Sequence, residues 1–140
     1  MDNDLKRTLI LEHYQNPVNK GLIKDDSYKF INMNNESCID EINLMVKIID
    51  DKIVDIRFDG DACAICTSAT SVMINTLLNK SVQEAKEIIK NYEYMIDEKD
   101  YDSDILAEAN IYSDIAKQPN RKKCALLSWW GIRKVIDNEK

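Results

Sequence analysis

The segment INLMVKIIDDKIVDIRF, residues 42–58, decides the fold class of this chain. Apolar side chains occupy alternate positions in both halves of the segment, at Ile42, Leu44, Val46 and Ile48 and then at Val54, Ile56 and Phe58. This period of two is typical of strands that bury one face. Asp50-Asp51-Lys52 separates the halves and favours a turn, so the segment predicts an antiparallel β-hairpin.

Helices are expected on either side of the hairpin. Residues 4–15 have helical spacing and end at Asn16-Pro17, and residues 28–33 alternate weakly, as in a third strand. The helices expected after the hairpin span residues 64–78, 81–90, 105–115 and 121–137, with a short helix and a loop in the acidic stretch 92–104. Ser81 and Glu84 have the spacing of a capping box.

This order of elements predicts one domain over residues 1–140. A helix followed by strands and then by more helices is typical of the α+β class. We expect a small antiparallel β-sheet of about three strands, with the helices packed on one face.

The composition excludes several classes of function. The 140 residues are 44% hydrophobic with a formal net charge of −6, and the scattered lysines and arginines argue against a nucleic-acid partner. No apolar run is long enough to span a membrane, and the acidic N-terminus does not resemble a secretory signal. We therefore expect a cytoplasmic protein, in which thiols stay reduced and four cysteines indicate metal binding or catalysis.

Three cysteines and an aspartate are the strongest candidates for chemistry. They are Cys38 and Asp40 in the triplet Cys38-Ile39-Asp40, Cys63 after Asp59-Gly60-Asp61-Ala62, and Cys124 after Arg121-Lys122-Lys123. Thiolates and a carboxylate suit a tetrahedral zinc ion. Cys63 and Cys124 each begin a predicted helix, where the positive end of the helix dipole lowers the pKa of a thiol. Taken singly, each cysteine also fits a buried or capping role, so both interpretations stay open.

The fourth cysteine, Cys66, is expected to be structural. It falls on an apolar helical stripe with Ala69, Met73 and Leu77. Such a stripe favours core packing. A Cys63–Cys66 pair is a weak metal signal, because the sequence has no second pair of this kind.

The remaining residues of functional type also favour structural roles. His13 is the only histidine, and no serine stands out as its partner in a catalytic triad. We expect Trp129 and Trp130 to pack in the core. The sequence has no Gly-rich phosphate loop, so nothing in it supports nucleotide binding.

Four motifs resemble those of a known family. They are HYQNPVNKG at residues 13–21, CID at 38–40, GDAC at 60–63 and PNRKKCALLSWW at 119–130. Together they cover nearly the whole chain and resemble the U-type iron–sulfur assembly proteins, most closely the SufU-type zinc-dependent sulfurtransferases. The resemblance implies a SufE/NifU-like fold.

The resemblance also implies a function. It implies a zinc site made by Cys38, Asp40, Cys63 and Cys124. Three thiolates, one carboxylate and Zn²⁺ would leave the site negatively charged, so we expect Arg121 to offset part of this charge as a nearby supporting residue. In this family, Cys38 would accept persulfide sulfur from a pyridoxal-phosphate (PLP) cysteine desulfurase of the SufS type, after a desulfurase histidine displaces it from zinc. The sulfur would then pass to downstream iron–sulfur assembly proteins.

Two alternatives remain. The first is a scaffold of the IscU/NifU type that builds a transient [2Fe–2S] cluster on the same cysteines, and the second is a protein that keeps the fold around a purely structural zinc. Scaffolds usually carry a histidine just before the last cysteine, where this chain has Lys123. SufU-type chains have extra residues between the second and third cysteines, and the stretch 92–104 can supply them. Ile39 and Ala62 replace glycines that are usual in the family.

Overall fold

The computed structural model describes residues 1–35 and 39–138. In chain order its elements are α1 (Asn3–Gln15), β1 (Lys29–Asn34), β2 (Glu41–Ile49), β3 (Lys52–Asp59), α2 (Ala64–Leu77), α3 (Val82–Ile96), the 3-10 helices η1 (Ser103–Lys117) and η2 (Pro119–Arg121), and α4 (Lys122–Asp137). The three strands form one antiparallel sheet in the order β1-β2-β3.

The predicted hairpin is present as β2 and β3. Ile49 pairs with Lys52, which leaves Asp50 and Asp51 as a two-residue turn. Both have positive φ, 51° and 61°, as a turn that matches the right-handed twist of the strands requires. Ile42, Leu44, Val46, Ile56 and Phe58 are buried as the alternation predicts. Ile48 and Val54 are only half-buried, and Ile53 is buried in place of Val54, because the strand register shifts between Lys47 and Ile48.

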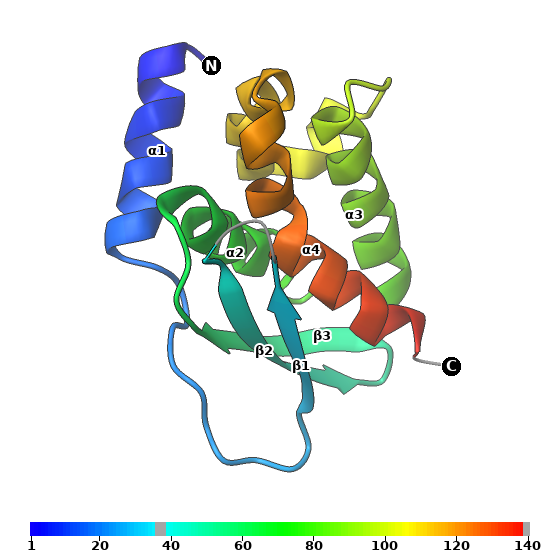
Figure 1. Cartoon of the computed structure of the whole chain (residues 1–140). Coiled ribbons are helices and arrows are strands. Elements are labelled where there is room, and N and C mark those ends of the chain that lie inside the picture. Colours follow the sequence, from blue (N-terminus) through cyan, green and yellow to red (C-terminus); the bar gives the residue numbers. More distant parts are fainter. Residues whose placement is uncertain (36–38, 139–140) are drawn as a thin grey trace.

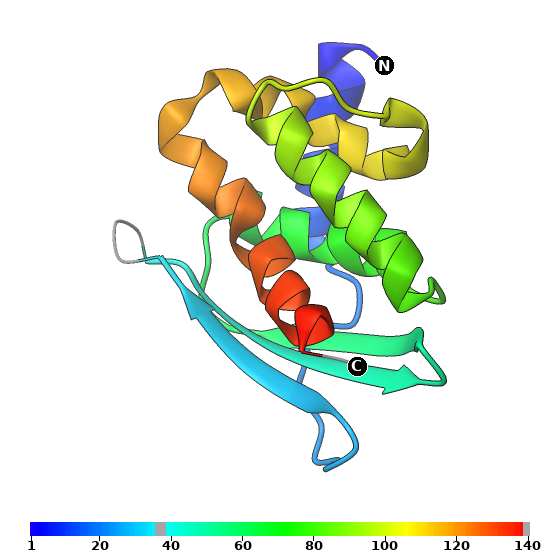
Figure 2. The same cartoon turned by 90° about the vertical axis from the view of Figure 1, so that its right-hand side faces the viewer.

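All the helices lie on one side of the sheet, as the sequence predicts (Figures 1 and 2). Helix α4 contacts β1 and β2, and α2 contacts β3. Helix α3, helix α1 and η1 pack behind these two. The α+β class with a three-stranded antiparallel sheet is therefore confirmed. No helix within the described ranges has the length and apolar character that crossing a membrane requires.

Helix α4 lies close to the sheet because Gly131 faces it. A methyl group at this position would come within 2.8 Å of the side chains of Leu44 and Met33. On the opposite side of α4, Trp129 stacks on Tyr92 with ring centroids 3.8 Å apart. The Tyr92 hydroxyl donates a hydrogen bond to the Ala125 carbonyl at 2.8 Å, so this aromatic pair ties α3 to α4.

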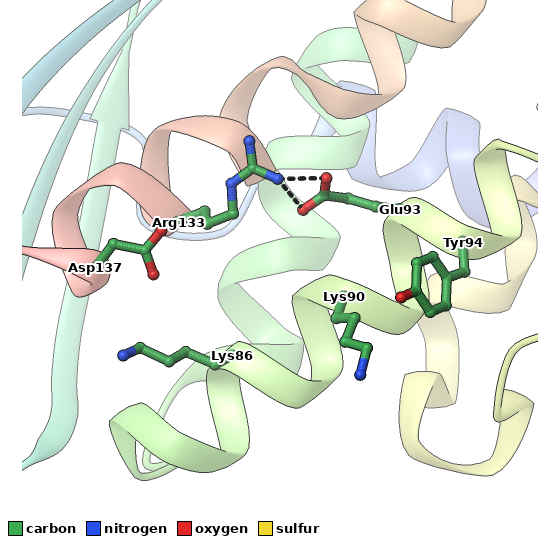
Figure 3. Close-up of a pocket in the computed structure, with 6 residues that line it drawn as sticks. All are labelled: Lys86, Lys90, Glu93, Tyr94, Arg133 and Asp137. Atoms are coloured by element: carbon green, nitrogen blue, oxygen red, sulfur yellow. Dashed lines mark hydrogen bonds and ion pairs between the residues drawn. The ribbon is translucent and has the colours of Figure 1, made fainter.

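Helices α3 and α4 also meet through charged side chains at the surface. Arg133 donates to both carboxylate oxygens of Glu93, at 2.7 Å to Oε1 (Figure 3). This ion pair lies in a shallow surface cleft between α3 and α4. The two other cationic side chains that line the cleft, Lys86 and Lys90, belong to α3 (Figure 3).

Three sequence expectations need correction. Helix α3 has the predicted capping box at Ser81, but it ends at Ile96 and not at residue 90, because Tyr92, Met95 and Ile96 continue its buried stripe. The helix expected over residues 105–115 is a 3-10 segment from 103 to 117, kinked at Ala107 with φ 47°. Trp129 is fully buried as predicted, whereas Trp130 is only half-buried and one side of it faces a groove.

Candidate metal centre

Three of the four predicted metal ligands meet at one point. Asp40 lies in the loop before β2, Cys63 is the N-cap of α2, and Cys124 lies in the first turn of α4. One ligand atom from each lies within 4.8 Å of the others. The fourth predicted ligand, Cys38, lies outside the described residues. Two thiols and a carboxylate, all half-buried or buried, form a donor set that suits zinc.

The Asp40 carboxylate is held in place by Cys63. Its Oδ1 accepts a hydrogen bond from the Cys63 backbone N–H at 2.7 Å, and its Oδ2 lies 3.7 Å from Cys63 Sγ. Neighbouring ligand atoms of a tetrahedral zinc site are about 3.5–3.8 Å apart, given zinc–sulfur and zinc–oxygen bonds of about 2.3 and 2.1 Å. The Asp40–Cys63 pair therefore has the spacing that zinc requires. Asp40 is 1% exposed, so water does not compete for this carboxylate.

The two thiols lie at helix N-termini, as the sequence predicts. Cys63 Sγ accepts a hydrogen bond from the Cys66 backbone N–H at 3.4 Å. The sulfur atom thus takes the place of the side-chain oxygen that is usual at a helix N-cap. Cys124 is the third residue of α4. Both helix ends present positive partial charge to the centre, which favours anionic ligands there.

Gly60 brings the two ligand-bearing segments together. Its φ is +140°, and a methyl group built on it would lie 2.0 Å from the Glu41 backbone oxygen. The Glu41 N–H donates to the Asp61 carbonyl at 2.8 Å. The chain therefore passes so close to the residue after Asp40 that only glycine fits at position 60.

The sequence predicts that the helix N-termini lower the pKa of both thiols, but burial outweighs this effect when no cation is bound. Burial raises the pKa of Cys63 above its ordinary value, and the nearby Asp40 carboxylate adds to the rise. The pKa of the Cys124 thiol rises further, first because of burial and then because of its hydrogen bond to Asp40 and the charge of Cys63. Both thiols are therefore protonated at neutral pH, and a bound dication has to displace these protons.

This protonation predicts that zinc affinity depends strongly on pH. Because the raised pKa values keep both thiols protonated up to a higher pH, protons compete with zinc for the sulfur atoms in the neutral range. The affinity for zinc should therefore fall as the pH falls. We expect a change of about tenfold or more per pH unit between pH 6 and 8, since at least one thiol proton is displaced. Competition with a chromophoric chelator at several pH values measures it. A pH-independent affinity, after correction for the chelator, would show that the thiols do not bind zinc. Cys66→Ala is the control that should keep the slope.

Arg121 does not contact the centre. It is exposed, and within residues 1–35 and 39–138 its side chain makes no ion pair with Asp40, Cys63 or Cys124. It lines a hollow of about 730 Å³ between α1, η1 and the start of α2. Its supporting role therefore stays a prediction.

Cys66 packs as the sequence predicts. It is fully buried in the core, together with the other members of its stripe, Ala69, Met73 and Leu77. Although it is one helical turn from Cys63, its thiol is not part of the three-residue cluster.

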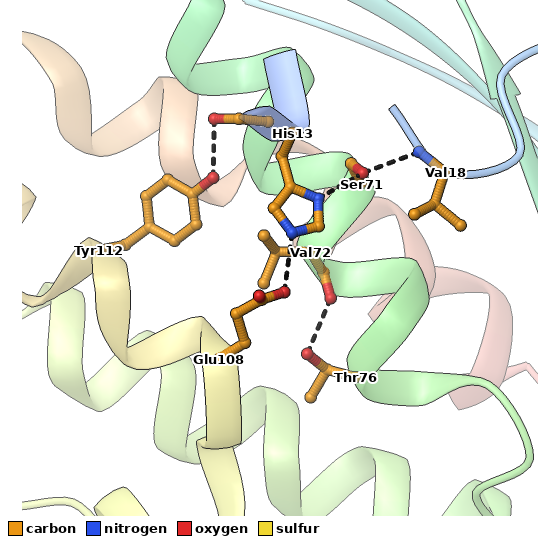
Figure 4. A network of polar contacts seen from close by, with 8 residues as sticks. His13, Val18, Ser71, Val72, Thr76, Glu108 and Tyr112 are labelled. Carbon is orange, nitrogen blue, oxygen red and sulfur yellow. Dashed lines mark hydrogen bonds and ion pairs between the residues drawn. The ribbon is translucent and has the colours of Figure 1, made fainter. Parts of the chain in front are cut away.

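His13 has partners that sequence analysis missed. Its Nδ1 lies 2.7 Å from Ser71 Oγ, and its Nε2 lies 2.8 Å from Glu108 Oε1 (Figure 4). A carboxylate only accepts, so Nε2 carries the hydrogen. Ser71 Oγ also accepts the backbone N–H of Val18 at 2.8 Å. These are the residue types of a hydrolase triad, but the serine faces Nδ1 and the carboxylate faces Nε2, the reverse of that arrangement, and Ser71 is fully buried and cannot reach a substrate. The network joins α1 to α2 and η1.

The comparisons with known proteins agree with this architecture. The model of the NifU-like N terminal domain matches residues 5–125. The chain is 35% identical to the zinc-dependent sulfurtransferase SufU of Bacillus subtilis, with 96% of this chain and 91% of that protein covered. It is 32% identical to the iron–sulfur cluster assembly scaffold protein IscU of Streptococcus pyogenes, covering 96% of this chain and 84% of that one.

A solved structure shows the same fold. The crystal structure of FiSufU from Fervidobacterium islandicum matches with a TM-score of 0.83 and 36% identity, over 86% of this chain and 88% of that chain. The family model covers most of the chain, and the curated relatives cover nearly all of it. This chain therefore belongs to the family of the NifU-like N terminal domain, as a SufU/IscU-type protein.

Proposed function

We propose that this SufU/IscU-type iron–sulfur cluster assembly protein is a zinc-dependent sulfurtransferase. In this proposal residues 1–140 form a single domain that works in the cytoplasm. It accepts persulfide sulfur on Cys38 from a PLP-dependent cysteine desulfurase of the SufS type and passes that sulfur to downstream iron–sulfur assembly proteins.

The donor set is the observation that carries the proposal. Asp40 gives the centre a hard oxygen ligand beside Cys63 and Cys124, which suits zinc better than an iron–sulfur cluster. A scaffold that completes its ligands with histidine would need an available imidazole. The only histidine, His13, has both ring nitrogens engaged by Ser71 and Glu108. Lys123 precedes Cys124 and is exposed.

Each protein group has a defined task in the proposed reaction. The Cys38 thiolate attacks the terminal sulfur of the desulfurase persulfide, a new sulfur–sulfur bond forms on Cys38, and the donor cysteine leaves as a thiolate, so no external oxidant is needed. Asp40, Cys63 and Cys124 would hold zinc throughout. When bound, zinc supplies positive charge that keeps the thiols deprotonated despite their burial.

Exposed apolar side chains near the centre support docking of a protein partner. Ile39, beside Asp40, is 79% exposed, and Tyr14 is 44% exposed. Both line a shallow surface hollow that also includes Gly60 and Ala62, at the turn that leads to Cys63. Large exposed apolar side chains grouped in this way are typical of interaction sites.

The proposal predicts where sulfur is found after a reaction with the desulfurase. Incubation of the zinc-loaded protein with a SufS-type desulfurase and cysteine should place an extra sulfur on the peptide that contains Cys38, as detected by mass spectrometry after alkylation. Cys38→Ala should abolish this signal and the stimulation of desulfurase turnover, whereas Cys66→Ala should retain both. Sulfur mainly on Cys66 or Cys124 would contradict the proposed acceptor.

Reconstitution separates this function from the scaffold alternative, which the 32% identity to the Streptococcus pyogenes scaffold keeps open. After anaerobic incubation with iron and sulfide, the zinc-loaded protein should hold no cluster that survives desalting. A stoichiometric [2Fe–2S] cluster that passes to an apo-ferredoxin would favour the scaffold. Zinc without any effect on the desulfurase would favour a structural metal.

A further inference from the structure

Within residues 1–35 and 39–138, no strand pairs with the outer edge of β1. The Asn35 N–H donates to the Asp40 carbonyl at 3.0 Å, so this pair occupies a hydrogen-bonded position of the β1–β2 ladder. Because such pairs alternate in antiparallel strands, the backbone groups of Phe30, Asn32 and Asn34 point away from β2. The direction of the Glu41 N–H agrees with this alternation. Glu41 is the β2 partner of Asn34, and its N–H donates to Asp61 on the other side of β2.

The other edge of the sheet is covered. At β3, Phe58 exchanges backbone hydrogen bonds with Asn19 and Gly21, and Ile53 does so with Asn79 and Lys80. Among the described residues no backbone hydrogen bond of this kind reaches the outer edge of β1. An uncovered edge strand is a template for another strand.

A groove of about 500 Å³ lies beside the end of this edge. Its walls are Met33, Asn34 and Asn35 on the strand side and Lys123, Leu127, Trp130 and Lys134 on α4. The four α4 residues follow the three- and four-residue spacing of one helical face. A strand added to β1 would therefore place alternate side chains against this face of α4.

The chemistry of the groove is apolar in the middle and positive at both ends. Trp130 is half-buried and Leu127 is buried, whereas Lys123 and Lys134 are exposed. The lysines are about 16 Å apart along the helix, given a rise of about 1.5 Å per residue, which about five residues of extended chain span. On the other face of β1, Phe30 is 59% exposed and offers a second apolar contact.

We propose that an extended acidic segment of a partner protein binds here as a fourth strand along β1. Its backbone would pair with Phe30, Asn32 and Asn34, one apolar side chain would rest on Trp130, and acidic side chains at either end would face Lys123 and Lys134. In a chain of net charge −6, two lysines around an apolar strip select an acidic ligand over a basic one.

A second copy of this chain fits the edge less well. A twofold axis through the β1 edge would place the two α4 helices antiparallel on the same face of a joint sheet. Lys123 of each copy would then face Lys134 of the other, and four lysines would gather around the joint without an acidic partner. Like charges in such a position oppose association, so charge favours the acidic segment.

The groove begins next to the metal centre but does not depend on it. The backbone N–H of Asn35 donates a hydrogen bond to the Asp40 carbonyl, and Lys123 directly precedes Cys124. A strand bound in the groove therefore ends beside two of the proposed ligands. The inference stands whether the centre serves sulfur transfer or cluster assembly.

The test uses the full chain and a capped fluorescent peptide, Glu-Thr-Leu-Thr-Leu-Thr-Glu, with a lysine-for-glutamate version as the control ligand. Asn32→Pro removes one outward N–H and leaves the β2 ladder intact, and Asn32→Ala is its matched control. Lys134→Glu reverses one terminal charge, and Lys90→Glu on α3 is the matched charge control (Figure 3).

We expect the acidic peptide to bind and the basic one to bind at least about tenfold more weakly. Asn32→Pro and Lys134→Glu should each weaken the acidic peptide by about tenfold, while both controls leave its affinity unchanged. Bound peptide should also slow amide hydrogen exchange at Asn32 and Asn34, which remains informative if Asn32→Pro does not fold. No binding at millimolar peptide, exchange protection elsewhere, or a dimer abolished by Asn32→Pro would overturn the proposal.

Discussion

Asp40→Ala is expected to lower the affinity for zinc by about 100-fold or more. Loss of a group that only supports a metal ligand costs about 10–100-fold, and a directly bound ligand should cost at least as much. The variant also leaves the Cys63 N–H without its acceptor, which makes part of the loss structural. Asp40→Asn separates the two effects, because an amide oxygen still accepts from Cys63 but carries no charge.

Metal analysis of the purified variants, followed by chelator competition, measures this effect. Cys63→Ala and Cys124→Ala should lose zinc in the same way, and Cys38→Ala should weaken it. Two controls belong to the series. Asp61→Ala removes an exposed carboxylate on the same turn, and Cys66→Ala removes a buried thiol one helical turn from Cys63. If Cys66→Ala lost zinc and Asp40→Asn kept it at full affinity, the ligand assignment would be wrong.

Gly60→Ala is expected to destabilise the protein by about 2–4 kcal/mol and to impair zinc binding. A non-glycine residue held at positive φ costs about 1–3 kcal/mol, and the new methyl group would also collide with the Glu41 backbone oxygen. Relief of that collision moves the segment that follows Asp40 away from the turn that precedes Cys63. The fold and the metal centre should therefore suffer together.

Gly21→Ala is the matched control for this change. Gly21 also has a positive φ, +122°, but nothing lies within 4 Å of a methyl group built there. Its replacement carries the backbone strain without the collision, and it lies outside the metal centre. Denaturant unfolding of the zinc-free and zinc-loaded variants compares the two. Equal losses of stability, with zinc binding intact in both, would show that the close approach at Gly60 does not shape the centre.

The hairpin and the helices that carry Cys63 and Cys124 were predictable because their signals are local. The alternation from Ile42 to Phe58 depends on residues two apart, and the positions of Cys63 and Cys124 at helix starts follow from short patterns. The end of α3 was missed although its signal was present. Tyr92, Met95 and Ile96 continue a stripe with helical spacing, but the acidic and polar residues between them suggested a loop.

Other features depend on contacts that no local pattern contains. Ser71 is 58 positions from His13 and Glu108 is 95 positions away, so only the packing of three helices brings this network together. The groove beside β1 was missed for a similar reason. Trp130 resembles a core residue in sequence, and its half-buried position follows from how α4 crosses the sheet.

The attachment of α1 has a consequence for local unfolding. His13, near the end of α1, is the only buried residue of this helix, and α1 lies at the margin of the helical layer (Figure 1). Leu9 and Ile10 also pack against the core, but a helix with a single buried residue is expected to open at a lower free energy than the whole protein unfolds. Ile10 and Leu11 of α1 also line the hollow that contains Arg121. A ligand that prefers α1 either docked or released would therefore shift the equilibrium between the packed form and a form in which α1 is detached from α2.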